Sequence, residues 1–329
     1  MDKGAEEMNE IGRKITDKII EIHGSTDFTI VFLPYKRSMW DCMESVYEEC
    51  IASGIDAHCV PIPFYRMKQH KEIDLEDYEL SYFDSYAERT EILDTLKIDY
   101  AVIHYQYNGN NNVTRMLPEF YTEAIKERYH CEVIFIPYGI PFGGLSNKHH
   151  RIQPGIINCD YLFLNSEEEV KEFLSDWSEI GVKFDGHVWG YGSPKIDAVL
   201  KAKPNIPERW LKEIDGRPVT LVTNSLGPYL ARPFERINRY REIIYAELDS
   251  CHAVIFRPHP LLDSTIKSMR PDTMAYFDNF LIDLSLEEHV IIDHYEYLEE
   301  TIAISDKLFS DPSSIVEMWK ATGKPYEVI

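Results

Sequence analysis

The segment from Ser310 to Ser314 (Ser-Asp-Pro-Ser-Ser) places two adjacent hydroxyl groups where a strand is expected to end and a helix to begin. The first turn of a helix offers unpaired backbone N–H groups at the positive end of its dipole. A phosphate could therefore bind there, with Ser310, Asp311, Ser313 and Ser314 around it. Asp311 and Ser313 are also ordinary helix-capping residues, so a purely structural cap is the alternative.

A second candidate is the segment Arg257-Pro258-His259-Pro260, at the expected end of another strand. The flanking prolines restrict the backbone and so present an imidazole and a guanidinium at the strand end. Arg257 could hold a diphosphate through a bidentate fork, and His259 could donate to a developing negative charge. A structural histidine is the alternative, because so short a motif is weak by itself.

Gly192, Ser193 and Lys195 belong to a third segment, from Gly190 to Asp197, near an expected domain crossing. Glycine lets the backbone approach a ligand closely, and Lys195 could face a phosphate. The segment could equally be a hinge turn.

The first half of the chain supplies candidates for binding an anionic acceptor, namely Lys36, Arg37 and Asn108. Solvated loop charges are the default alternative for such residues. An attacking hydroxyl must lose a proton, and His104 or an aspartate on the same edge is a better candidate base than Tyr138, whose ordinary pKa is too high.

Alternating strands and helices are expected to position these residues. In the first half, apolar runs predict strands at 28–33, 58–64, 100–105, 132–137 and 161–165, with helical periodicity between them. A second series of strands is expected at 218–223, 253–257, 289–292 and 307–310. This alternation predicts parallel, doubly wound sheets that bind ligands beyond the carboxyl ends of their strands.

A break in this pattern near residue 200, rich in proline, predicts two domains. Residues 1–200 would form an N-terminal Rossmann-like acceptor domain with a leading helix. Residues 201–329 would form a C-terminal Rossmann-like domain that binds the nucleotide donor.

Composition narrows the classes of function. The 329 residues carry a formal charge of −22, which argues against nucleic acid as a partner and against a polybasic membrane attachment. The six cysteines have no zinc-type or disulfide spacing, and no phosphate-loop, dinucleotide or Asp-x-Asp motif occurs, so no metal or cofactor is expected. The opening residues are acidic and no long apolar run follows, which predicts a cytoplasmic protein, peripheral to the inner face of the plasma membrane only through a partner or another segment.

The order of the three motifs resembles the second half of the CDP-glycerol glycerophosphotransferases, which build polymers of the teichoic-acid kind. The resemblance begins near Gly190 and includes Ser305-Asp306 ahead of the serine motif. It implies a glycosyltransferase-B-like α/β fold, with two Rossmann-like domains facing a cleft. It also implies transfer of glycerol phosphate from CDP-glycerol to a polymer or glycan hydroxyl, with Arg257 and His259 steadying the diphosphate and Ser313 and Ser314 hydrogen-bonding it.

Two motifs of that family differ here. Its Trp-His-Gly-Thr-Pro motif corresponds to Pro137-Tyr138-Gly139-Ile140-Pro141, and its Pro-Thr-Trp-Arg motif corresponds to Val222-Thr223-Asn224-Ser225. Two other functions therefore stay open: a glycosyltransferase with a nucleotide-sugar donor, and a non-catalytic nucleotide-binding relative.

Overall fold

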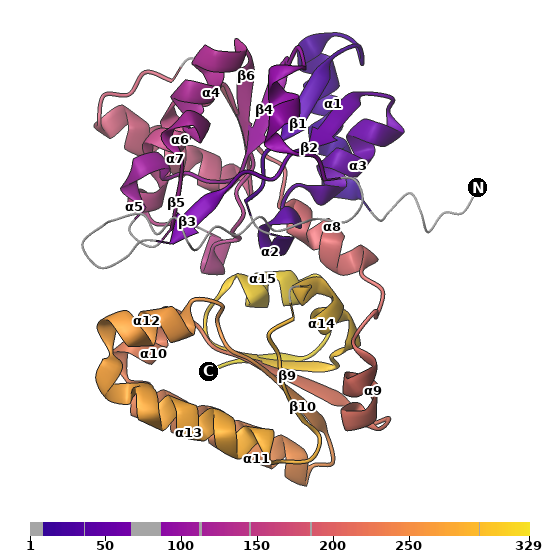
Figure 1. The fold of residues 1–329 in the computed structure, drawn as a ribbon, viewed down its shortest axis with the longest axis vertical. Helices are drawn as coiled ribbons and strands as arrows, with labels where there is room; N and C mark the ends of the chain where they lie inside the picture. The colour runs from indigo at the N-terminus through magenta and orange to yellow at the C-terminus, as the bar shows by residue number, and fades with distance from the viewer. Residues whose placement is uncertain are drawn as a thin grey trace. The chain divides into compact units, whose positions relative to one another are not determined.

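The computed structural model describes residues 9–35, 37–66, 87–111, 114–144, 146–184, 186–295 and 297–329. The chain divides into two compact units, Met1–Lys201 and Ala202–Ile329. In Figure 1 the second unit is the one drawn mainly in orange and yellow. Each unit has its own sheet and its own core, and each is described separately below.

The first unit contains a parallel sheet of six strands in the order β2-β1-β4-β6-β7-β8. Along β1, Val31 faces one apolar cluster while Ile30 and Phe32 face another, so both sides of the sheet are covered. Parallel strands buried on both faces read as continuous apolar runs, which is why they are visible in the sequence. The strands are β1 (Thr29–Phe32), β2 (Asp56–Cys59), β4 (Tyr100–Ile103), β6 (Glu132–Phe135), β7 (Tyr161–Leu164) and β8 (His187–Gly190).

Helices cover both sides of this sheet (Figure 1). Helix α1 packs against α3 so closely that a Cβ on Gly12 would lie 2.6 Å from the carbonyl carbon of Ser45, which explains the glycine in an otherwise good helix. A short antiparallel pair, β3 (Phe64–Arg66) with β5 (Thr114–Met116), is separate from the main sheet. The helices are α1 (Glu10–His23), α2 (Arg37–Trp40), α3 (Glu44–Ala52), α4 (Thr122–Tyr129), α5 (Lys148–Arg151), α6 (Pro154–Ile157), α7 (Glu167–Glu179) and α8 (Pro194–Lys201).

The second unit contains a parallel sheet of five strands in the order β11-β10-β9-β12-β13. Helices α11 and α13 lie on one side of it and α14 and α15 on the other (Figure 1). The strands are β9 (Val219–Thr223), β10 (Ala253–Arg257), β11 (Val290–Ile292), β12 (Lys307–Ser310) and β13 (Tyr326–Val328). The helices are α9 (Glu208–Ile214), α10 (Leu226–Ala231), α11 (Pro233–Asp249), α12 (Leu262–Met269), α13 (Met274–Ser285), α14 (Leu298–Ile304) and α15 (Ser314–Lys320).

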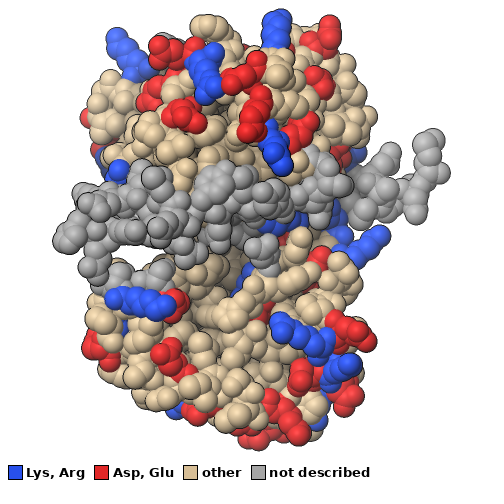
Figure 2. Space-filling model, viewed as in Figure 1, with Lys and Arg blue, Asp and Glu red and all other residues tan. Residues whose placement is uncertain are grey.

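The expected fold class is confirmed: both units are parallel α/β sheets of the Rossmann-like kind. The assignment of the first unit to the acceptor and of the second to the donor stays a prediction. Acidic side chains lie among Lys and Arg over the visible surface of both units (Figure 2). No helix in the described part of the chain is long and apolar enough to cross a membrane.

Candidate functional site

The carboxyl ends of β9, β10 and β12 bring two of the predicted motifs together in the second unit. Strand β9 lies between the other two, so the loop that follows it contacts both neighbours. On one side the hydroxyl of Thr223 donates to Ser310 Oγ at 2.7 Å. On the other side the backbone N–H of His259 donates to Asn224 Oδ1 at 2.9 Å. A polar layer therefore joins the Arg257–Pro260 turn to the serine motif at the edge where doubly wound sheets bind ligands.

The imidazole of His259 is fixed as a neutral hydrogen-bond donor. The backbone N–H of Leu261 donates to its Nδ1 at 3.1 Å, so the neutral ring carries its proton on Nε2. Burial lowers the pKa of His259 to about 4, because an apolar environment disfavours the charged ring. At neutral pH the ring can donate through Nε2 to an oxygen of a ligand.

The guanidinium of Arg257 is paired inside the second unit. Its Nη1 lies 2.6 Å from Oδ2 of Asp293, and both side chains are buried. Asp293 also accepts hydrogen bonds from the Thr301 hydroxyl at 3.1 Å and the Tyr295 backbone N–H at 2.6 Å. The positive charge that the sequence offered to a diphosphate is thus already balanced, although Nη1 is only one of several donors on the group.

The serine motif divides into an inner and an outer part. Ser310 and Asp311 are fully buried, whereas Ser313 and Ser314 are half-buried. The Ser310 hydroxyl donates to the Asp311 carbonyl at 2.7 Å and lies 3.2 Å from Ser313 Oγ. Ser313 makes no capping hydrogen bond to α15, which has only seven residues. The outer hydroxyls are therefore the ones that a ligand could reach.

Asp311 supports the loops around it. Its Oδ2 accepts hydrogen bonds from the Ser225 backbone N–H at 2.9 Å and from the Tyr240 hydroxyl at 2.5 Å. Its Oδ1 lies 3.2 Å from Nη1 of Arg236, which balances the negative charge. The burial of Tyr240 and the nearby Asp311 carboxylate raise the pKa of this tyrosine well above its ordinary value. These contacts show a residue that joins three segments of the second unit.

Asn224 is a member of this edge that sequence reasoning missed. It is 3% exposed, and its Nδ2 has no hydrogen-bond partner among the described residues. The only sequence signal was its place directly after a buried strand, where the resembled family carries a different motif. That signal is too general to single out one amide.

The predicted donor segment around Lys195 is anchored within the first unit. Lys195 Nζ lies 2.7 and 2.6 Å from the two carboxylate oxygens of Asp41, and the side chains are 8% and 3% exposed. Ser193 is also buried, and its hydroxyl accepts the Lys195 backbone N–H at 3.4 Å. Gly192 has a φ of 102°, which side chains of L-residues rarely adopt.

The same segment also closes the first turn of α1. The Asp197 carboxylate accepts hydrogen bonds from the backbone N–H groups of Gly12 at 2.7 Å and Ile11 at 3.2 Å, and from the Ser45 hydroxyl at 2.8 Å. A carboxylate is favourable at this end of a helix dipole. Burial nevertheless raises the pKa of Asp197, against these hydrogen bonds. The motif thus ties α8 to α1 and α3.

The two candidate bases of the first unit are poorly suited to accept a proton. His104 is 0% exposed, and its Nε2 accepts the Tyr35 backbone N–H at 3.4 Å. Burial, with a smaller effect from the Lys195 charge, lowers the pKa of His104 to about 3. Tyr138 lies edge-on to His104 with ring centroids 6.0 Å apart, and burial raises its pKa above the ordinary value. A catalytic role for either residue stays a prediction.

The candidate acceptor residues have partners of their own. Arg37 is buried and lies 3.8 Å from Glu44. Asn108 is buried in a left-handed turn with φ 45°, and its Nδ2 donates to Glu123 at 2.8 Å. Lys36 lies outside the described residues.

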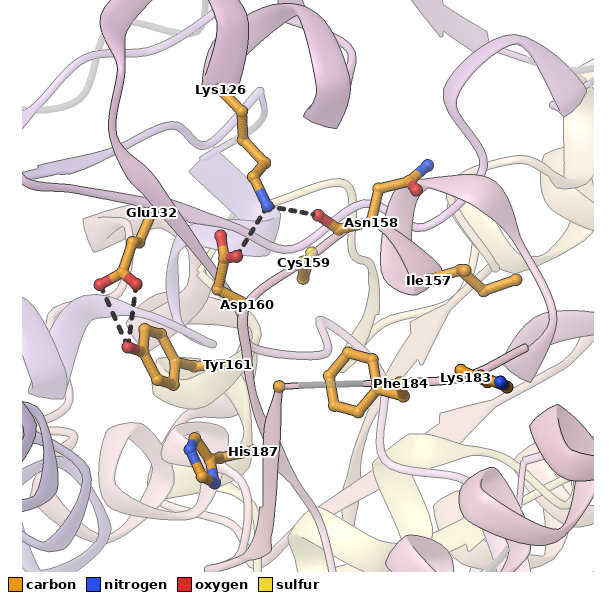
Figure 3. A pocket seen from close by; sticks show the side chains of 11 residues that line it. Lys126, Glu132, Ile157, Asn158, Cys159, Asp160, Tyr161, Lys183, Phe184 and His187 are labelled. Carbon is orange, nitrogen blue, oxygen red and sulfur yellow. Dashed lines mark hydrogen bonds and ion pairs between the residues drawn. The ribbon is translucent and has the colours of Figure 1, made fainter.

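A pocket of about 360 Å³ lies at the opposite, amino-terminal end of the first unit's sheet (Figure 3). It opens between the first residues of β6, β7 and β8, namely Glu132, Tyr161 and His187. Three of its charged groups are engaged, because Lys126 pairs with Asp160 at 2.7 Å and both Glu132 oxygens accept the Tyr161 hydroxyl at 3.1 Å. Its size suits a small ligand. It lies at the amino-terminal ends of the strands, however, whereas doubly wound sheets bind their ligands at the carboxyl ends.

No family model and no curated protein matches the sequence. Solved structures do match the fold. The MnaA–UDP co-structure from S. aureus has a TM-score of 0.56 and 12% identity, over 92% of this chain and 78% of that one. The UDP-GlcNAc 2-epimerase from Neisseria meningitidis bound to UDP-GlcNAc has a TM-score of 0.55 and 16% identity, over 91% and 82%.

The wall teichoic acid polymerase TagF, soaked for 15 minutes with CDPG, has a TM-score of 0.50 and 15% identity, over 99% of this chain and 75% of that one. At such identities the likeness shows the fold alone. The chain shares the glycosyltransferase-B-like fold of these enzymes. Among the described residues no group of histidine, cysteine and acidic side chains could hold a metal ion.

Proposed function

We propose that the protein is a transferase that binds a nucleoside-diphosphate donor at the carboxyl edge of its second unit. The observation that carries the proposal is His259, whose neutral ring is held with its Nε2 proton available at the end of β10. Ser313 and Ser314 lie half-buried beyond the end of β12, which β9 separates from β10. Neutral donors at such an edge suit phosphate oxygens, which are acceptors only.

The donor that the motif order favours is CDP-glycerol, with a polymer or glycan hydroxyl as acceptor. In that reaction the acceptor oxygen attacks the phosphorus of the glycerol phosphate group, and the bond from that phosphorus to the CMP oxygen breaks. Negative charge then develops on the departing CMP phosphate. His259 Nε2–H and the outer serine hydroxyls would stabilise this charge.

The proton of the attacking hydroxyl needs an acceptor late in the reaction. Loose phosphoryl-transfer transition states require little help from a base, which fits the lowered pKa of His104 and the raised pKa of Tyr138, whose hydroxyl stays protonated at neutral pH. Arg37, Asn108 and Lys36 remain the proposed acceptor-binding residues of the first unit.

Calorimetric titration of the protein with CDP-glycerol, CMP, UDP and GDP tests this proposal most directly. We expect CDP-glycerol and CMP to bind more tightly than UDP or GDP, and CMP to be released when an acceptor is added. Equal binding of all four nucleotides would contradict the cytidine assignment.

A nucleotide-sugar glycosyltransferase is the second candidate, since the same edge would accept any nucleoside diphosphate. A non-catalytic relative is the third, favoured because the pKa of His104 is lowered and that of Tyr138 is raised, so neither side chain is suited to accept a proton at neutral pH. Product analysis separates them. Release of UDP from a UDP-sugar supports the glycosyltransferase, whereas nucleotide binding without release of CMP or UDP under any acceptor mixture supports the binding protein.

A further inference from the structure

Asn224 carries an unexplained polar group at the carboxyl edge of the second unit. This residue is only 3% exposed, and its Nδ2 has no hydrogen-bond partner among the described residues. A buried donor group that makes no hydrogen bond destabilises the fold by about 1 to 3 kcal/mol. Such a group calls for a partner that the polypeptide does not supply.

The orientation of the amide is fixed by its neighbour. Oδ1 accepts the backbone N–H of His259 at 2.9 Å. A flipped amide would turn Nδ2 toward that N–H, so that two donors would face each other. The unpartnered atom is therefore a donor, and the residue that sets its direction is His259.

The surroundings select an acceptor-rich partner. Both nearby carboxylates are paired with cations of the chain, Asp293 with Arg257 and Asp311 with Arg236, although Asp311 Oδ1 accepts no hydrogen bond among the described residues. His259 Nε2 is a second donor on the same turn. A ligand that presents several oxygens and no protons meets this need, and a phosphate or diphosphate has that chemistry.

We infer that Asn224 is a donor-binding residue whose Nδ2 hydrogen-bonds a phosphate oxygen of the ligand, while its Oδ1 holds the His259 turn in place. This inference rests on the proposed function in locating the ligand at this edge. It gives the Val222–Ser225 segment, which differs from the resembled family's motif, a direct contact with the anion.

The test compares Asn224→Asp with the wild-type chain by calorimetric titration of CDP, UDP and inorganic pyrophosphate. Aspartate keeps the acceptor for the His259 N–H, removes the donor and adds a negative charge. We expect its affinity for all three probes to fall about 10- to 100-fold, the range for losing a hydrogen bond to a charged group. Asn238→Asp is the matched control, because this exposed amide on α11 accepts the Tyr276 hydroxyl at 2.6 Å through its oxygen, and aspartate retains that acceptor.

Unchanged pyrophosphate affinity in Asn224→Asp would overturn the inference. Should that variant fail to fold, Asn224→Ala replaces it; we expect a loss of at least the same size, and wild-type affinity would again overturn the inference. A wild-type chain that binds pyrophosphate but no nucleotide would refute the proposed function while still allowing the role of Asn224 to be read. A wild-type chain that binds none of the probes would refute both.

Discussion

The carboxyl edges of the two sheets are built from similar residue types but differ in what completes them. In the first unit, Lys195 is matched by Asp41 and Asp197 by the start of α1, whereas the buried Nδ1 of the candidate base His104 has no hydrogen-bond partner among the described residues. In the second unit, the buried Asn224 Nδ2 has no hydrogen-bond partner among the described residues, and it lies beside the His259 turn, where the neutral ring carries its proton on Nε2. Polar residues at a strand end therefore indicate a ligand site only where the protein does not complete their hydrogen bonds itself.

The largest effect that tests this difference between the two edges is expected at Lys195, in the free energy of unfolding. Replacing it with Met leaves the Asp41 carboxylate buried without its partner at 2.6 Å, which typically costs about 3 to 5 kcal/mol. The free energy of unfolding of the first unit should fall by that amount in urea titrations, while the folded protein keeps its nucleotide affinity.

Two variants control the Lys195 experiment. Lys201→Met removes a more exposed ion pair with Glu48 from the same helix, and we expect a loss of at most about 1 kcal/mol. Adding Asp41→Asn to Lys195→Met should restore much of the stability. Reduced nucleotide affinity with unchanged stability would instead show that Lys195 faces the ligand, as the sequence first suggested.

The next effect concerns His259. His259→Ala should lower donor affinity or turnover about 10- to 100-fold, because one charge-assisted hydrogen bond contributes about 1.5 to 3 kcal/mol. Stability should fall only by the value of the bond from the Leu261 N–H, about 0.5 to 1.5 kcal/mol. Affinity is measured by calorimetry and stability by thermal unfolding.

His104→Ala is the matched histidine in the first unit. Its ring is fully buried, so truncation should leave a cavity and lower the melting temperature without changing nucleotide affinity. If the two alanine variants gave the same pattern, with stability lost and binding retained, His259 would be a structural histidine and the contrast between the two edges would disappear.

A smaller effect is expected at Asp293. Asp293→Asn keeps the shape of the side chain but removes the negative charge 2.6 Å from Arg257. The uncompensated guanidinium should then attract a diphosphate more strongly, and we expect affinity to rise about three- to tenfold at low salt, with this gain shrinking as salt is added. A fall in affinity would mean that the carboxylate serves the ligand by orienting Arg257.

Much of this fold can be predicted from the sequence, because its central strands are buried on both faces and therefore appear as continuous apolar runs. The expected strands at 253–257 and 307–310 coincide with β10 and β12. The edge strand β8 (His187–Gly190) was not predicted, since it has no fully buried residue to mark it. Between the expected strands at 28–33 and 58–64, where helical periodicity was expected, the structure has two helices, α2 and α3, with Asp41 between them.

The partners within the candidate sites could not be predicted in the same way. Asp41 is 154 residues from Lys195, and Asp293 is 36 residues from Arg257. Hydrophobic periodicity reports local structure and carries no information about which distant carboxylate meets a given cation. The sequence therefore located the strand ends, whereas only the three-dimensional arrangement shows which of their polar groups are already paired.

The last expected effect is a dependence of stability on pH that the two histidines share. Burial holds the pKa of His259 at about 4 and that of His104 at about 3, whereas a histidine in the unfolded chain titrates near 6.5. Between these values the unfolded state binds more protons, so stability falls as pH is lowered from about 6.5 toward 4. In denaturant titrations across this range, His259→Gln should lose less stability than the wild type. The affinity of the wild type for CDP-glycerol, which has no phosphate monoester that titrates near pH 6, should stay constant between about pH 6 and 8, because His259 remains neutral throughout. A rise in affinity as pH falls through about 6.5 would show that the ring binds its ligand as a cation. The second edge would then differ from the first through the charge of His259 and not through a neutral hydrogen-bond donor.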